Sequence, residues 1–130
     1  MTEKPLQEIS YIDLPLMEKM CHPLAVAVFD KADDPIASFE EAETEKLDAA
    51  LSNPRQIFGG IDLYPTFTKK AAILYYGINK THAFKNGNKR MATASLLVFL
   101  YINNYWLQGD KKSNEDYLVN LALRVAGSNG

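Results

Sequence analysis

The sequence predicts an all-α bundle that carries one β-hairpin. Apolar residues recur at helical spacing through most of the chain, whereas only residues 53–66 combine β-prone pieces with a glycine pair suited to a tight turn. The chain has 130 residues, 47% hydrophobic and 23% charged, so it is long enough to bury a core without disulfides. We therefore expect one domain spanning residues 1–130.

The composition also indicates where the protein works. No apolar run approaches the roughly eighteen residues of a membrane-spanning helix, and the N-terminus lacks the apolar core of a signal peptide. Because Cys21 is the only cysteine, no internal disulfide can form, and a reducing cytoplasmic location with no membrane partner is expected. Cys21 lies in an apolar helical segment, which favours a core position over a nucleophilic role.

The first helical pattern spans residues 13–29, after a lead-in over residues 1–10 that we expect to be loose. Pro15 falls near the helix start, where its missing N–H costs nothing. Pro23 should break the pattern, so we expect two short helices or one kinked helix.

A turn-rich loop over residues 31–35 and a short helix over residues 40–51 should follow. In residues 53–66, Gly59 and Gly60 tolerate the positive φ that a tight hairpin turn requires. A lone hairpin in a helical protein is marginal by itself, so we expect it to be a mobile flap over a site. The residues expected to face inward from the short helix are Ala42, Leu47, Ala50 and Leu51.

Two longer helices should form the centre of the bundle. Thr66 can cap a helix that runs to about Lys80. A helix from Asn88 to about Tyr105 is apolar nearly all round, which predicts a place in the middle of the bundle. Beyond Gly109, a last amphipathic helix should begin at a cap formed by residues 113–116.

Charge is distributed unevenly along the chain, although the net charge is only −2. Residues 1–50 carry twelve acids and four bases, and residues 51–130 carry four acids and ten bases. Two solvated faces would explain this, and so would a basic half that meets an anion. Direct nucleic-acid binding is not expected, because the chain is acidic overall and lacks an aromatic-basic stripe, so a small phosphorylated ligand fits better. The cations that gather in one stretch are Lys69, Lys70, Lys80, Lys85, Lys89 and Arg90.

Residues 81–90 form a polar segment between two apolar helices, which is where binding and catalytic groups concentrate. Gly87 and Asn88 permit backbone angles that turn successive N–H groups toward one point, and the N-terminus of the following helix adds a partial positive charge. Lys89 and Arg90 lie in the first helical turn, where the helix dipole disfavours cations. An incoming phosphate would supply the missing negative charge, and an arginine can grip two of its oxygens.

His82, at the other end of this segment, can take up a proton at neutral pH. A base beside a phosphate cradle indicates phosphoryl or nucleotidyl transfer to a hydroxyl. The structural alternative is a buried, hydrogen-bonded histidine followed by a glycine turn between two helices.

The residues His82-Ala-Phe-Lys-Asn-Gly-Asn-Lys-Arg90 resemble the signature of the Fic/Doc family, His-x-Phe-x-(Asp/Glu)-Gly-Asn-(Gly/Lys)-Arg, and the resemblance covers roughly residues 50–108. It implies an all-α fold with the motif between two central helices and a hairpin flap that docks the target. His82 would be the general base for a target hydroxyl, and Phe84 would anchor the loop in the core. Gly87 and Asn88 would supply backbone donors, and Lys89 and Arg90 would hold the phosphates of ATP. The flap would consist of Phe58, Gly59, Gly60, Ile61, Asp62 and Leu63.

Two positions depart from the commoner pattern of the family. Many AMP-transferring members carry a second arginine where this chain has Thr93; the death-on-curing (Doc) toxin branch lacks it and shares Lys89. That branch is understood to phosphorylate a translation elongation factor. This chain also lacks the Ser/Thr-x-x-x-Glu-Gly/Asn helix by which some relatives inhibit themselves, so a separate antitoxin would restrain it.

Asn86 is the second departure, because the family normally has a carboxylate there to hold Mg²⁺. An amide oxygen can ligate Mg²⁺ but brings no charge, so metal affinity and rate should fall, and Asn86→Asp should raise both. The resemblance therefore implies a Doc-like, ATP-dependent toxin that transfers phosphate to a target in the translation machinery. The alternatives are a Fic-type AMP transferase and a catalytically attenuated relative that only binds.

Overall fold

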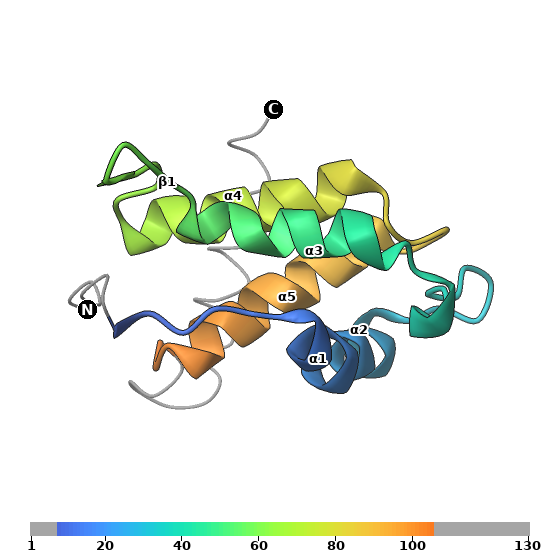
Figure 1. Ribbon diagram of the computed structural model, residues 1–130. Helices are drawn as coiled ribbons and strands as arrows, with labels where there is room; N and C mark the ends of the chain where they lie inside the picture. The colour runs from blue at the N-terminus through green and yellow to red at the C-terminus, as the bar shows by residue number, and fades with distance from the viewer. Residues whose placement is uncertain (1–7, 106–130) are drawn as a thin grey trace.

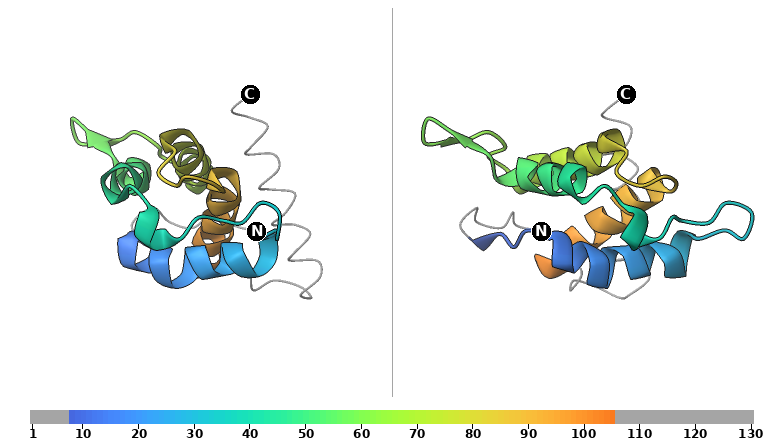
Figure 2. Two further views of the ribbon diagram at one scale, coloured as in Figure 1. Left: turned by 90° about the vertical axis from the view of Figure 1, so that its right-hand side faces the viewer. Right: turned by 45° about the vertical axis from the view of Figure 1, so that its right-hand side comes forward.

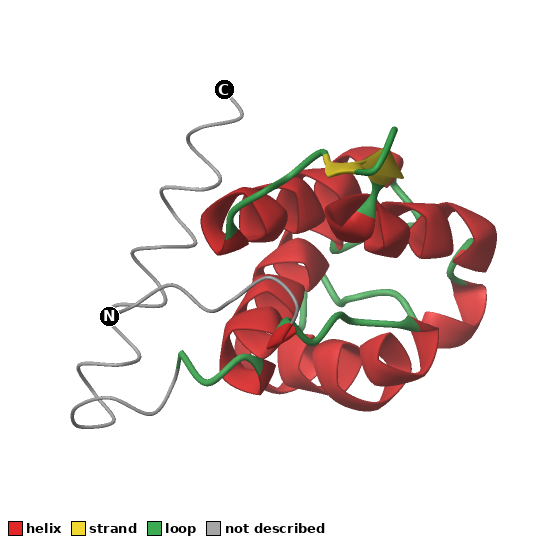
Figure 3. Ribbon diagram, turned by 60° about the vertical axis from the view of Figure 1, so that its left-hand side comes forward, coloured by secondary structure: helices red, strands yellow, loops and turns green. Residues whose placement is uncertain are grey.

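The computed structural model describes residues 8–105, and helices dominate this part of the chain (Figures 1 and 3). The only β-sheet within residues 8–105 is a single two-stranded hairpin, so the predicted all-α bundle with one hairpin is confirmed. In order, the elements are α1 (Leu14–Leu16), the π-helical η2 (Met17–Cys21), α2 (His22–Phe29), the 3-10 helix η3 (Phe39–Glu41), α3 (Thr44–Ser52), the 3-10 helix η4 (Asn53–Arg55), β1 (Ile57–Phe58), β2 (Ile61–Asp62), α4 (Phe67–Thr81) and α5 (Asn88–Ile102).

Helix α5 occupies the centre of the bundle, as its apolar surface predicts. It lies between α4 on one side and the α1–α2 segment on the other, and α3 runs along the outside of α4 (Figure 1). Because α5 is covered from several sides, both polar and apolar positions are buried along it. Its buried residues are Met91, Ala92, Ala94, Ser95, Leu96, Val98, Phe99 and Leu100.

The first helical segment passes through Pro23 without breaking, so of the two expected forms the two separate short helices are wrong. α1, η2 and α2 are contiguous, and the residues at their junctions keep right-handed helical angles. Proline lacks an N–H and its ring crowds the carbonyl four residues earlier. The π-helical turn of η2, in which the N–H of His22 donates to the carbonyl of Met17, widens the helix immediately before Pro23 and avoids this conflict.

Other boundaries differ by a few residues from the sequence-based expectation. α3 begins at Thr44 rather than Glu40, because residues 39–41 form a separate 3-10 turn. α4 starts after Thr66, whose hydroxyl accepts a hydrogen bond from the N–H of Lys69, as predicted. α5 ends at Ile102. The helix expected after residue 113 lies outside the described residues.

Core contacts hold residues near both ends of the described range against α4 and α5. The ring of Phe67 stacks on those of Phe99 and Tyr105, with centroids 4.9 and 4.5 Å apart. The buried Asn103 accepts a hydrogen bond from the N–H of Ser10 and donates to its carbonyl, so the end of the lead-in is fixed rather than loose.

Cys21 is fully buried next to Ser95, and burial raises the pKa of its thiol to about 12. The thiolate needed for nucleophilic attack is therefore suppressed at neutral pH. The core role predicted for Cys21 agrees with this environment.

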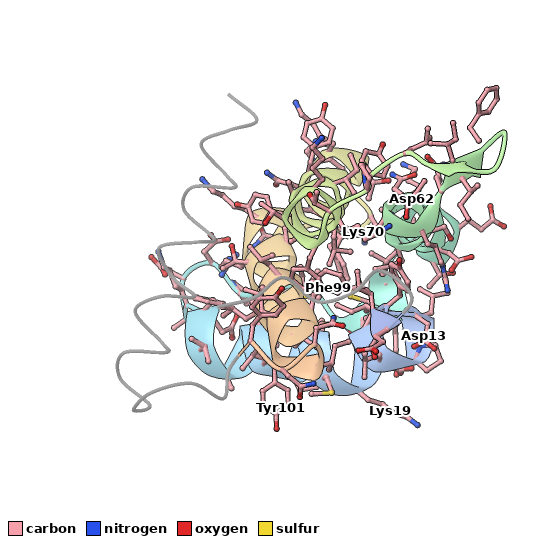
Figure 4. The ribbon with its side chains drawn as sticks, turned by 90° about the vertical axis from the view of Figure 1, so that its left-hand side faces the viewer. Asp13, Lys19, Asp62, Lys70, Phe99 and Tyr101 are labelled. Carbon is pink, nitrogen blue, oxygen red and sulfur yellow. The ribbon has the colours of Figure 1, made fainter. Side chains whose placement is uncertain are left out.

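Lys70 has no exposed surface, which corrects its assignment to the basic surface of the chain. Its ammonium donates to the carbonyl oxygen of Pro54 at 2.6 Å and to Oδ2 of Asp62 at 2.8 Å. In Figure 4 the side chains of Lys70 and Asp62 point toward each other at the base of the hairpin. A buried ammonium requires such partners, so Asp62 serves the fold by fixing the hairpin to α4 and η4.

We expect Asp62→Asn to lower the free energy of unfolding by about 1–3 kcal/mol at neutral pH, because it removes the charged partner of a buried lysine. The hydrogen bond from Lys70 holds the pKa of Asp62 below its ordinary value of 3.8. The stabilisation is therefore complete above pH 3.8 and is lost as the pH falls through the lowered pKa. Urea unfolding at neutral pH and stepwise below pH 3.8 measures this.

Asp48→Asn is the matched control, since it removes one carboxylate from the exposed face of α3. It should change the free energy of unfolding by less than about 0.5 kcal/mol, the usual range for surface substitutions. A deficit of Asp62→Asn that stays constant down to the lowest pH would contradict the linkage.

Candidate active site

The segment between α4 and α5 reverses the chain through two residues with left-handed backbone angles. His82 ends α4 with φ 50° and ψ 44°, and Gly87 precedes α5 with φ 87° and ψ 18°. Glycine adopts such angles readily, whereas a histidine there carries strain. A strained, exposed histidine at the start of a polar loop is typical of a functional position.

Phe84 anchors the loop, as the sequence predicts. Its side chain is buried, and the centroid of its ring lies 6.0 Å from the ring centroid of Phe39 and 6.2 Å from that of His22. One residue earlier, the carbonyl of Ala83 accepts a hydrogen bond from the N–H of Glu43 at 2.8 Å. The loop is thus held by segments from three parts of the chain.

Asn88 closes the loop with its side chain, a role that the sequence analysis did not assign. Its Oδ1 accepts from the N–H of Phe84 at 3.0 Å, and its Nδ2 donates to the carbonyl of Phe84 at 2.7 Å. An amide side chain carries both the acceptor and the donor that these two backbone groups require. The backbone of residues 84–88 is therefore locked into one turn.

The N-terminus of α5 has the features of an anion-binding position. No side chain caps this helix, so its first N–H groups lack a side-chain acceptor and add to the positive end of the helix dipole. Gly87 lies against Ile36, and a Cβ at this position would approach the Ile36 side chain to 3.1 Å. Lys89 is exposed, whereas the side chain of Arg90 is 18% exposed.

Both Asn86 and Arg90 contact the loop that follows α2. Nδ2 of Asn86 donates to Oδ1 of Asp34 at 2.5 Å and to the carbonyl of Pro35 at 2.7 Å. Nη1 of Arg90 donates to the carbonyl of Asp34 at 2.7 Å and to that of Phe29 at 3.4 Å, and Nη2 lies 3.3 Å from Oδ2 of Asp34. Asp34, which the sequence analysis did not single out, joins both ends of this part of the motif.

These contacts change the expectation for position 86. A carboxylate at this position would face the carboxylate of Asp34 and the carbonyl of Pro35, both of which are acceptors. Asn86→Asp would therefore place like charges in contact.

The donor set near Asn86 is compatible with Mg²⁺. With Nδ2 directed at residues 34–35, Oδ1 of Asn86 is the side-chain oxygen that can face a bound metal, and Mg²⁺ takes oxygen ligands mainly from phosphates and water. The described residues contain no group of three His, Cys, Asp or Glu side chains that could hold a metal alone. Any Mg²⁺ at this site would therefore depend largely on the nucleotide.

The hairpin does not cover the loop, which corrects its expected placement as a flap over the site. The hairpin precedes α4 and the loop follows it, so a helix of 15 residues separates them by about 22 Å (Figure 1). Gly59 and Gly60 form its turn with φ 59° and 79°, and β1 pairs with β2 in antiparallel register. Phe58, Ile57 and Ile61 are 78%, 67% and 71% exposed, and Leu63 is 47% exposed, so the hairpin presents an apolar surface of its own.

Comparison with known proteins identifies the family. A sequence profile described as "Fic/DOC family" matches residues 14–100, more than half of the chain. The chain belongs to the Fic/DOC family. It is 42% identical over 80 residues to a protein named "Toxin Doc" from Mycolicibacterium smegmatis. That alignment covers 60% of this chain and 62% of the relative, so the chain spans less than two thirds of its length. No solved structure matches this Fic/DOC chain.

Among residues 8–105 no helix is long and apolar enough to cross a membrane. Within the Fic/DOC motif, Phe84 is buried in the core, Gly87 precedes α5, and Lys89 and Arg90 lie in the first turn of α5. Thr93, where a second arginine occurs in many relatives, donates its hydroxyl hydrogen to the carbonyl of Lys89 at 2.9 Å.

Asn88→Asp tests the loop closure. A carboxylate keeps the acceptor for the N–H of Phe84 but cannot donate to its carbonyl, which should lower the free energy of unfolding by about 1–2 kcal/mol. The helix dipole alone would favour the new negative charge by about 0.3–1 kcal/mol. Chemical denaturation of the two proteins therefore decides between the two effects by sign, and a stabilised variant would contradict the closure role.

Proposed function

We propose that this Fic/DOC chain is a Doc-type toxin that transfers phosphate from ATP to a hydroxyl of a target protein. The observation that carries the proposal is the folded motif, in which an exposed His82 begins the loop and the uncapped N-terminus of α5 ends it. The 42% identity to a protein named "Toxin Doc" supports the same activity class. The proposal includes a target protein from the translation machinery.

The reaction assigns one task to each part of the loop. His82 takes the proton of the target hydroxyl, whose oxygen forms a bond to the γ-phosphorus while the bond to the β–γ bridging oxygen breaks and ADP leaves. The backbone N–H groups at the start of α5, together with Lys89 and Arg90, bind the phosphate oxygens. Mg²⁺, when bound beside Oδ1 of Asn86, would neutralise phosphate charge.

Phosphate transfer is preferred to AMP transfer because of position 93. Thr93 stands where a second arginine would be, and its hydroxyl donates to the backbone of its own helix turn. Within the first two turns of α5, no cation follows Arg90. A nucleotide would then find its phosphate contacts concentrated on the loop and on Lys89 and Arg90. A cognate antitoxin is proposed as the partner that restrains the toxin, in keeping with the name of the relative.

A target protein would use the exposed apolar hairpin for docking. Since about 22 Å of α4 lie between the hairpin and His82, the docked segment and the acceptor hydroxyl would be separated by about seven residues of extended chain.

Label transfer from ATP distinguishes the candidate activities. The protein is incubated with a translation extract and ATP that carries label on either the γ- or the α-phosphate. We expect transfer of the γ label to a protein, because the site lacks the second arginine of many AMP-transferring relatives. Transfer of the α label would instead establish the Fic-type AMP transferase, and transfer of neither would leave a relative that only binds its partners.

His82→Gly separates the chemical role of the histidine from its structural one. Glycine adopts the left-handed angles of this position without strain, so the variant should lose γ-phosphate transfer while its stability stays the same or rises by up to about 1 kcal/mol. His82→Ala is the control, since it removes the imidazole but keeps the strain. Thermal unfolding and label transfer are measured together, and a fully active glycine variant would contradict the general-base role.

A further inference from the structure

The carboxylate of Asp34 lies in the site, although residue 34 is 52 positions away from Asn86 in the sequence. Its Oδ1 accepts from Asn86, its Oδ2 pairs with Nη2 of Arg90 at 3.3 Å, and its carbonyl accepts from Nη1 of Arg90 at 2.7 Å. One residue therefore engages the two motif side chains that would serve the phosphates and their metal.

The loop that carries Asp34 is anchored at both ends and exposed in the middle. Ile36 is buried against Gly87, and its N–H donates to Oδ1 of Asp30 at 2.7 Å. The carbonyl of Ala37 is hydrogen-bonded to Nε2 of His22 at 2.8 Å. Between these anchors residues 30–35 are exposed, and the side chain of Asp34 is 55% exposed. In Figure 2 this loop and the motif loop extend from the same end of the molecule.

The contacts of Asp34 are those that a phosphate would make. A carboxylate and a phosphate use the same guanidinium N–H groups, so the carboxylate of Asp34 at Nη2 of Arg90 occupies a position that a phosphate oxygen would take. A carboxylate at this place also repels a polyphosphate. We propose that Asp34 is an internal competitor for the phosphate site, so that a nucleotide binds by displacing it from Arg90. This inference rests on the proposed function, because it assigns a regulator to the same phosphate site.

The hydrogen bond between Asn86 and Asp34 also explains why an amide suits position 86. Its amide donates to both Asp34 and Pro35, which keeps the loop over the motif, and a carboxylate at position 86 would repel it. The amide and the distant carboxylate thus form a complementary pair. Displacing the carboxylate of Asp34 breaks one hydrogen bond from Asn86 and one partly exposed ion pair to Arg90, so the competition is modest in strength.

Asp34→Asn tests the competition by binding alone. The substitution removes the charge and leaves the main-chain carbonyl of residue 34 in place for Arg90. Calorimetric titration with inorganic tripolyphosphate, and separately with ATP, is carried out on the full chain with and without Mg²⁺. We expect the variant to bind about two- to fivefold more tightly than the wild type in each case, since a partly exposed ion pair no longer competes.

Asp33→Asn is the matched control. Asp33 is the preceding residue, it is exposed, and its side chain makes no hydrogen bond or ion pair within residues 8–105. The control loses the same charge at nearly the same place, so it reports the long-range electrostatic effect and should tighten binding by less than Asp34→Asn. Thermal unfolding of both variants verifies that they remain folded.

Four outcomes would overturn the inference. Equal affinity in the wild type, the control and Asp34→Asn would exclude competition while leaving the phosphate site and the proposed function intact. Weaker binding of both ligands by Asp34→Asn would mean that Asp34 positions Arg90. Weaker binding only in the presence of Mg²⁺ would mean that Asp34 is a metal ligand. Absence of binding by every protein would remove the phosphate site, and with it the proposed function.

Discussion

The burial of Phe84 is the interaction on which the site depends. A loop between two helices is normally free to vary, but Phe84 of this loop packs against Phe39 and His22, and the amide of Asn88 holds its main chain. With Phe84 fixed, the backbone directions at both ends of the loop are fixed as well. His82 must then take left-handed angles, and Gly87 must turn the chain into α5.

The strained backbone angles of His82 persist because contacts with the surrounding structure fix the conformation of the loop. Residues at left-handed angles cost on the order of 1 kcal/mol or more unless they are glycine. The hydrogen bond from Glu43 to Ala83 and the packing of α5 in the centre of the bundle act against relaxation of this corner. Such a corner would suit the proposed function, in which a base and a phosphate cradle are held at a constant separation.

The hairpin and the Asp34 loop are attached to the bundle in different ways. The hairpin is tied to the bundle by the buried Lys70, whose ammonium has two oxygen acceptors within 2.8 Å, while its apolar tip is exposed. The Asp34 loop is anchored at its ends, but the carboxylate in its middle is held by contacts at the surface, which water can replace at little cost. A proposed docking surface fixed at its base and an easily displaced carboxylate at opposite ends of α4 would allow target docking and nucleotide entry to proceed independently.

The sequence by itself determined the bundle, its central helix, the hairpin turn and the corner residues from His82 to Arg90, because these depend on helical periodicity, capping and glycine geometry within short stretches. Tertiary structure decided the rest. Only packing could show that a π-helical turn carries the first helix past Pro23, that Lys70 belongs to the core, and that the hairpin does not fold back over the loop (Figure 1). The motif matched by pattern, but Asp34 reaches it from 52 residues away, and a contact between such distant residues leaves no local signal.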